Sequence, residues 1–267
     1  MSVRTTSNDS RGIGGRKVLD SHSLEFLSTR RTGGGTNEPK YITSNLLMSV
    51  DAANSSSYSG SGTTWSDLSG NGNNITLTSS GISYDSTDGG GSIVFDGTNG
   101  QGTSSINLNT MNNGGSLEIW CRITDTSGYR HIGGWRSSTA NAKFYMLLLY
   151  DDGRVEARAT WASDSNTDIV TSDYGTSFWA NNWNHIVLTN SDSDNKTRFY
   201  LNGSLVATST STVSTLPSYT SFELMKTNDL SILTGGGKLS QVRLYSDTLS
   251  GSEVTKNYNG TKGRFGL

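Results

Sequence analysis

The chain has 267 residues, and Gly, Ser, Thr and Asn together make up about half of them. That length suits one large domain with an appendage, and the composition excludes helical bundles and coiled coils, which need Ala, Leu, Glu and Lys. Six Trp, eleven Tyr and seven Phe supply the buried area that a disordered Gly/Ser chain lacks. A net charge of −2 excludes bulk electrostatic capture of nucleic acid or of an anionic membrane.

The first 41 residues differ in charge from the rest of the chain. They hold seven basic and four acidic residues, a local charge of +3, and leave −5 for residues 42–267. Glycines flank one short apolar cluster, so this segment cannot bury a core of its own, and we expect an extended N-terminal arm. Its basic and apolar side chains are candidates for anchoring the chain to a partner protein. They are Arg16, Lys17, Leu24, Phe26, Leu27, Arg30 and Arg31.

Two alternatives remain for the arm. Seven basic residues could contact nucleic acid, but the interspersed acids and the scarcity of aromatic residues disfavour that interpretation. A solvated tail without a partner is the other alternative. We therefore expect a protein partner and no nucleic acid.

Short alternating or apolar runs recur from residue 42 onward, separated by Gly, Asn and Asp. This pattern predicts an all-β, two-sheet antiparallel sandwich over residues 42–267. The clearest strand candidates are residues 46–50, 75–78, 92–95, 116–124, 143–150, 155–161, 183–189, 197–201 and 238–245. Asp152-Gly153 and Asn202-Gly203 predict tight hairpins, because Asn, Asp and Gly accept the positive φ that such turns require.

One short helix is predicted near the C-terminus. Ser250 or Ser252 can cap it, Glu253 falls in its first turn, and Gly260 ends it. The single cysteine, Cys121, lies within a strand candidate and is expected to be a small core residue. Because no stretch approaches the roughly 20 apolar residues of a membrane span, no such span is expected.

The order of several segments resembles the laminin-G-like members of the concanavalin A-like lectin and glucanase superfamily. These segments are residues 45–51, 59–74, 91–97, 116–120, 183–189, 199–203, 239–245 and 249–254. The resemblance implies a two-sheet jelly roll with the C-terminal helix packed near the chain end. Residues 257–267 are similar to the C-termini of virion structural proteins of tailed phages, especially marine ones, which suggests a viral source.

Paired carboxylates, the requirement for glycoside hydrolysis, are not evident. The superfamily's glucanases carry two Glu and an Asp alternating on one strand, whereas the comparable strand here offers Glu118 alone. Glu156 has no second acid two residues away, and Asp151 and Asp152 suit a hairpin turn. The three histidines are isolated in sequence and lack the spacing of a metal or triad motif. We therefore expect a protein without enzymatic activity.

Aromatic residues in or beside polar loops are candidates for stacking against sugars. These are Trp135, Trp161, Tyr174 and Trp179, with Trp135 and Trp179 the leading ones. Trp65, Trp120 and Trp183 are expected to pack in the core, as the resemblance implies, and Trp161 is a candidate for the same role.

Calcium has two sets of candidate oxygen ligands. The first set is Asp67, Asn71 and Asn73, and the second is Asp164 and Asp168. Turn chemistry explains the same residues without a metal, and this interpretation is preferred. No cofactor is therefore expected.

The leading hypothesis is a virion structural protein of a tailed phage, made in the host cytoplasm. In this hypothesis the arm anchors the chain to other capsid or tail proteins, and the sandwich is displayed outward in multiple copies or as a homo-oligomer. A decoration or cement role is favoured, because the chain lacks the heptad stalk of a fibre. The runner-up is a lectin-like adhesion module that binds a host surface glycan, for example in a tail fibre or neck appendage. A glucanase-like hydrolase is third.

Overall fold

A computed structural model describes residues 40–111, 114–128, 130–136, 143–158, 168–170, 173–209, 220–226 and 233–267. The predicted anchoring residues of the arm, together with Trp161 and Asp164, lie outside these ranges. Residues 40–267 form one compact unit. This unit begins two residues before the expected boundary, because Lys40 packs against Gly260 and the Tyr41 ring covers the Arg243 guanidinium group.

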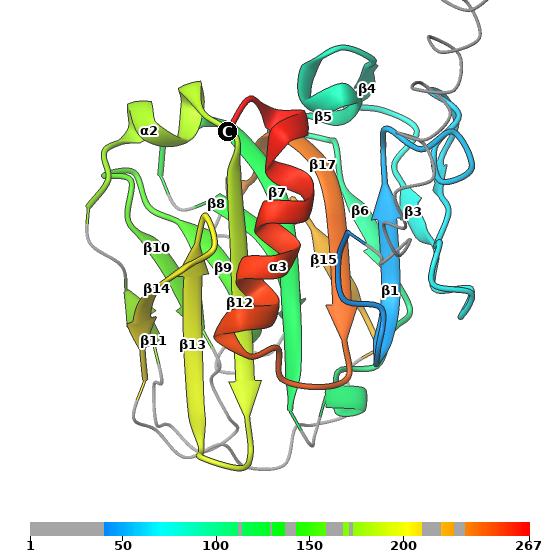
Figure 1. Cartoon of the computed structure of the whole chain (residues 1–267). Helices are drawn as coiled ribbons and strands as arrows, with labels where there is room; N and C mark the ends of the chain where they lie inside the picture. Colours follow the sequence, from blue (N-terminus) through cyan, green and yellow to red (C-terminus); the bar gives the residue numbers. More distant parts are fainter. Residues whose placement is uncertain are drawn as a thin grey trace, which may run out of the picture. The chain divides into compact units, whose positions relative to one another are not determined.

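The described strands form two stacked sheets, as the alternating pattern predicted (Figure 1). The first sheet has eight strands in the order β14-β13-β12-β7-β17-β5-β4, with β1 also paired to β17. Its strands are β1 (Leu46–Asp51), β4 (Ile82–Asp85), β5 (Ser92–Asp96), β7 (Gly115–Asp125), β12 (Asn184–Ser191), β13 (Lys196–Leu201), β14 (Ser204–Thr208) and β17 (Gly236–Tyr245).

The second sheet has nine described strands in the order β11-β10-β9-β8-β15-β6-β3-β2, with β16 paired to β8. Its strands are β2 (Thr64–Trp65), β3 (Ile75–Leu77), β6 (Gly102–Ser104), β8 (Arg130–Arg136), β9 (Lys143–Leu149), β10 (Val155–Arg158), β11 (Asp168–Val170), β15 (Phe222–Leu224) and β16 (Leu233–Thr234). The β16–β8 pair is parallel, and the other printed pairings in both sheets are antiparallel. This is a concanavalin A-like jelly roll.

Five helical segments accompany the strands in the described ranges. They are α2 (Thr176–Asn181), α3 (Gly251–Thr261) and three short 3₁₀ turns, η1 (Asp88–Gly90), η2 (Leu108–Met111) and η3 (Lys262–Phe265). Figure 1 shows α3 lying across the outer face of the eight-stranded sheet. None of the helices in the described ranges is long and apolar enough to cross a membrane.

Strand β7 is buried on both faces. Its alternate residues Leu117 and Ile119 belong to the core between the sheets, whereas Glu118 and Trp120 point to the opposite face and are also buried. Glu118 and Trp120 are shielded from solvent because α3 covers this part of the outer face. Cys121 is a fully buried core residue, as predicted, and burial raises the pKa of its thiol.

The predicted hairpins and helix cap are confirmed. Asn202 and Gly203 both have positive φ between β13 and β14, and the Tyr150 N–H donates to the Arg154 carbonyl across the β9–β10 turn. Ser250 caps α3 in a reciprocal capping box with Glu253.

Gly260 does not end the helix as predicted, because α3 continues through it to Thr261. The role of Gly260 is steric. A Cβ at residue 260 would lie 1.8 Å from the Lys40 carbonyl oxygen, so only glycine lets the chain at Lys40 cross the helix.

Candidate functional site

The two leading tryptophan candidates are buried and do not lie exposed in loops. Trp135 lies on β8, is fully buried, and donates its indole N–H to the Ile106 carbonyl at 2.8 Å. Trp179 lies in α2, is fully buried, and donates to the Gly153 carbonyl at 2.6 Å. Each indole N–H is hydrogen-bonded to the protein backbone. Because both rings are buried, neither has a face that can stack against a sugar.

Tyr174 is the remaining described aromatic candidate, and it is half-buried. Its ring stacks on Phe178, with 5.2 Å between centroids, and its edge contacts Trp179. These contacts make Tyr174 part of a small aromatic cluster beneath the β9–β10 hairpin. It does not converge with polar groups in a described pocket.

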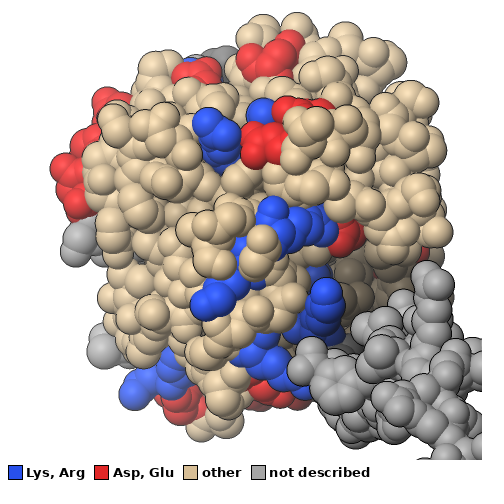
Figure 2. Space-filling view, turned by 45° about the horizontal axis from the view of Figure 1, so that its top comes forward, with Lys and Arg blue, Asp and Glu red and all other residues tan. Residues whose placement is uncertain are grey.

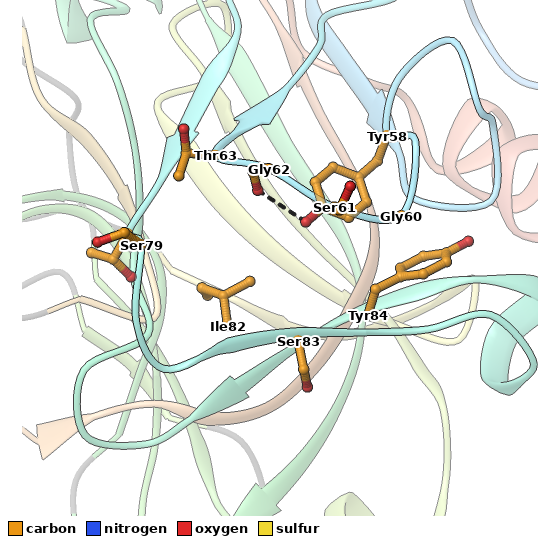
Figure 3. A pocket seen from close by; sticks show the side chains of 10 residues that line it. Tyr58, Gly60, Ser61, Gly62, Thr63, Ser79, Ile82, Ser83 and Tyr84 are labelled. Carbon is orange, nitrogen blue, oxygen red and sulfur yellow. Dashed lines mark hydrogen bonds between the residues drawn. The ribbon is translucent and has the colours of Figure 1, made fainter.

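A pocket lies instead where the edges of the two sheets meet. It has a volume of about 290 Å³ and is bounded by the loop before β2, the segment after β3 and strand β4. Strand β2 is the edge of the nine-stranded sheet and β4 that of the eight-stranded sheet. Tyr58 and Tyr84 form one end of the pocket, Thr63 and Ser79 lie at the other, and Ile82 lies between them (Figure 3).

The two tyrosine rings are held rigidly. Their centroids are 5.5 Å apart with the planes tilted by 59°. The Tyr58 hydroxyl donates to the Gly62 carbonyl and the Tyr84 hydroxyl to the Ala52 carbonyl, both at 3.1 Å. Burial, reinforced by the nearby Tyr84, raises the pKa of Tyr58 and keeps it a neutral phenol. Tyr58 is 4% exposed and belongs to the core, so the half-buried Tyr84 ring is the aromatic surface that a ligand can contact.

Gly60 brings the loop close to this surface. Its φ is +96°, and a Cβ there would come within 3.3 Å of the Tyr84 ring. A side chain would be strained and would crowd the ring, so glycine keeps the Tyr84 edge open.

The lining of the pocket is polar without being charged. Exposed hydroxyl groups come from Ser61, Thr63 and Ser79, and no Asp, Glu, Lys, Arg or His lines it among the described residues. On β4, Ile82 and Tyr84 share one face, whereas the Ser83 side chain points the other way (Figure 3). An apolar ring surface beside several neutral hydroxyls suits a small, uncharged, hydroxyl-rich ligand.

Two of the carboxylates considered for hydrolysis, Glu118 and Glu156, are buried. Glu118 is 1% exposed beneath α3, where it contacts Arg243, His185 and Asn257. Glu156 is 1% exposed and accepts a hydrogen bond from the Tyr150 hydroxyl. Each carboxylate takes part in a buried polar contact.

The first candidate calcium loop serves as a turn. The Asp67 carboxylate accepts N–H groups from Ser49, Ser69 and Asn73, so its oxygens are engaged by the backbone. Asn71 and Asn73 donate their amides to carbonyls of β1. Across the described ranges no cluster of three His, Cys, Asp or Glu residues is arranged to hold a metal. Of the second set, Asp168 lies on β11 and Asp164 outside the described residues.

Comparison with known families settles the relationship of the chain. The profile of the concanavalin A-like lectin/glucanases superfamily, in its laminin-G form, matches residues 95–255. The chain belongs to this superfamily. No sequence among functionally curated proteins matches it.

Several solved structures with the same fold are binding domains of toxins. The binding domain of botulinum neurotoxin serotype D has a TM-score of 0.62 at 14% identity, covering 82% of this chain and 52% of that one. The binding domain of Paraclostridial Mosquitocidal Protein 1 has a TM-score of 0.63 at 18% identity, covering 81% and 52%. A structure of botulinum neurotoxin type C, whose cell entry depends on two ganglioside molecules, has a TM-score of 0.63 at 16% identity, covering 82% and 52%.

The chain spans about half the length of these structures, and at such identities the likeness shows the fold alone.

Sequence reasoning missed the tyrosine pocket because its residues look like ordinary turn and strand residues. Tyr58 stands alone in a Ser/Gly-rich stretch, and Tyr84 lies twenty-six residues later on a short strand. Two features of the sequence could have indicated the pocket. Tyr58 is an aromatic residue in an otherwise polar loop, and Tyr84 is an aromatic residue on the edge strand β4.

Proposed function

We propose that the chain is a carbohydrate-binding, lectin-like module without enzymatic activity. The observation that carries this proposal is the pocket at the meeting of the sheet edges, where the half-buried Tyr84 ring, held against the buried Tyr58 ring, lies beside neutral hydroxyl groups. Aromatic faces bind the apolar side of a sugar ring, and hydroxyls pair with its polar edge. A volume of about 290 Å³ suits one sugar residue better than a long oligosaccharide.

The absence of charge in the described lining narrows the ligand class. A neutral terminal sugar loses no ion pair and leaves no charge unpaired when it enters such a pocket. Single weak sites of this kind become useful through avidity when many copies are displayed together. The ligand is therefore a neutral surface glycan met in multivalent form.

The Tyr84→Ala variant tests the pocket directly. We expect this change to weaken binding to an array of neutral glucose-, galactose- and mannose-terminated glycans at least tenfold, about 1.4 kcal/mol, because the exposed ring surface is lost. Tyr84→Phe keeps the ring and should bind within about threefold of the parent protein. Ser86→Ala is the control, because Ser86 is exposed directly after the same strand and is not among the residues that line the pocket.

Retention of binding by Tyr84→Ala, or equal losses in Tyr84→Ala and Ser86→Ala, would contradict this assignment. Circular dichroism and the thermal midpoint identify any variant that loses its fold.

We also propose that this module belongs to a virion structural protein of a tailed phage, displayed in multiple copies. Its support is the charge contrast between the arm and the body, together with the similarity of residues 257–267 to phage virion proteins. The arm would hold a capsid or tail protein through its basic and apolar residues.

Deletion of residues 1–39 tests the anchor while sparing Lys40 and Tyr41. In the phage that encodes the chain, we expect the truncated protein to disappear from particles purified on a density gradient. The purified truncated protein should still bind the glycan array, because the tyrosine pocket lies wholly within residues 40–267. Normal incorporation of the truncated protein would contradict the anchoring role.

A further inference from the structure

A second pocket, with different chemistry, lies on the outer face of the eight-stranded sheet. It has a volume of about 200 Å³ and is formed where the chain at Lys40 and Tyr41 meets β17 and the end of α3. Gly260 lines it, and the lack of a side chain there leaves the space open. None of the ten residues lining the tyrosine pocket takes part in it.

Arg243 is the buried charge of this pocket. Its side chain is 2% exposed, and it donates to Glu118 at 2.6 Å and to Gln241 at 3.1 Å. The Tyr41 ring lies over its guanidinium group, with 3.9 Å from the central carbon to the ring centroid. Within the described part of the chain its buried Nε–H has no hydrogen-bond partner. Arg243 therefore carries donor capacity that the protein leaves unused.

The charges that line the pocket are unbalanced. Arg264 is paired with Asp51 through two contacts of 2.8 Å, which neutralises one cation. Arg243 shares Glu118 with His185, and Lys40 lines the rim as an exposed residue. With Glu118 counted behind Arg243, three cationic side chains face two carboxylates, so the pocket keeps one cation in excess. Figure 2 shows Lys and Arg gathered across the middle of the face that it presents.

We propose that this pocket binds the carboxylate of an acidic sugar. A carboxylate is a planar, singly charged acceptor that matches a guanidinium group and an ammonium group together. It would compensate Lys40 and the partly compensated Arg243, and the volume of the pocket admits one sugar ring beside Gly260. This second site goes beyond the neutral glycan site proposed above and shares no residue with it.

The test titrates the full-length protein with glucuronate, glucose and acetate by isothermal calorimetry. We expect glucuronate to bind at least tenfold more tightly than acetate in the parent protein. Lys40→Glu should weaken glucuronate binding about tenfold, whereas Lys256→Glu should change it less than twofold. Lys256 is the matched control, because it lies exposed on α3, outside the pocket, and its substitution changes the charge equally.

Equal binding of acetate and glucuronate would overturn the assignment of a sugar. Equal weakening of glucuronate binding by Lys40→Glu and Lys256→Glu would overturn the assignment to this pocket, because general electrostatic attraction would then explain the effect. Absence of glucuronate binding would also overturn it. Tyr84→Ala separates this proposal from the first one, because that change should leave glucuronate binding to the second pocket unchanged. The two experiments can therefore contradict either binding proposal independently of the other.

Discussion

Replacing Glu118 by Gln is expected to lower the free energy of unfolding by about 3 to 5 kcal/mol. The Glu118 carboxylate is shared by Arg243 at 2.6 Å, His185 at 3.0 Å and Asn257 at 2.6 Å, all beneath α3. Glutamine keeps the shape but leaves the Arg243 cation buried without an anion, and breaking one partner of a buried pair carries a penalty of this size. Urea denaturation followed by tryptophan fluorescence measures it.

The same carboxylate predicts the acid response of the protein. Burial by itself would raise the pKa of Glu118, but the charge of Arg243 and the contacts with His185 and Asn257 outweigh it and hold the pKa at about 2. Because this pKa lies below the ordinary value of 4.5, the ionised carboxylate stabilises the fold at pH values above 4.5. That contribution, about 3 kcal/mol, should fade as the pH falls from 4.5 through 2.

The glutamine variant is the control for that pH window. It cannot titrate at position 118, so the stability difference between the parent protein and Glu118→Gln should shrink as the pH approaches 2. A difference that stays constant from pH 6 to pH 2 would contradict the depressed pKa.

Replacing Trp120 by Ala is expected to lower the free energy of unfolding by about 3 to 5 kcal/mol and to loosen α3 selectively. The indole stacks on Phe265 with 3.9 Å between centroids, and its N–H donates to the Thr261 hydroxyl at 3.0 Å. Truncation removes both contacts and leaves a cavity under the helix. Amide hydrogen exchange should show protection lost in residues 251–265 before the strands of the core.

A phenylalanine at position 120 separates the two contributions. It keeps a ring against Phe265 and loses the bond to Thr261, so about 1 to 2 kcal/mol should be lost. A loss below 1 kcal/mol in Trp120→Ala, or uniform loss of protection over the whole sandwich, would contradict the view that this residue fastens α3.

Much of the fold followed from local signals in the sequence. Alternation along residues 116–124, the Asn202-Gly203 turn and the Ser250–Glu253 capping box each appear in the structure as predicted. Such features depend on side-chain direction and backbone conformation within a few residues, which the sequence carries directly.

The site could not be predicted in the same way, because exposure depends on contacts across the chain. Trp135 and Trp179 stand in polar surroundings in the sequence, yet their indoles are buried on carbonyls that lie 29 and 26 residues away. Gly260 resembles a helix stop, yet it is the point where Lys40 crosses the helix from 220 positions earlier. Tyr58 and Tyr84 meet only because the edges of two sheets come together.

A crystal structure of the protein soaked with a neutral glycan that the array retains tests the central claim most directly. Our account predicts a sugar ring over Ile82, against the Tyr84 ring and within hydrogen-bond distance of Ser79 or Thr63. A glycan bound elsewhere on the sandwich, or an array that retains no neutral glycan, would contradict it.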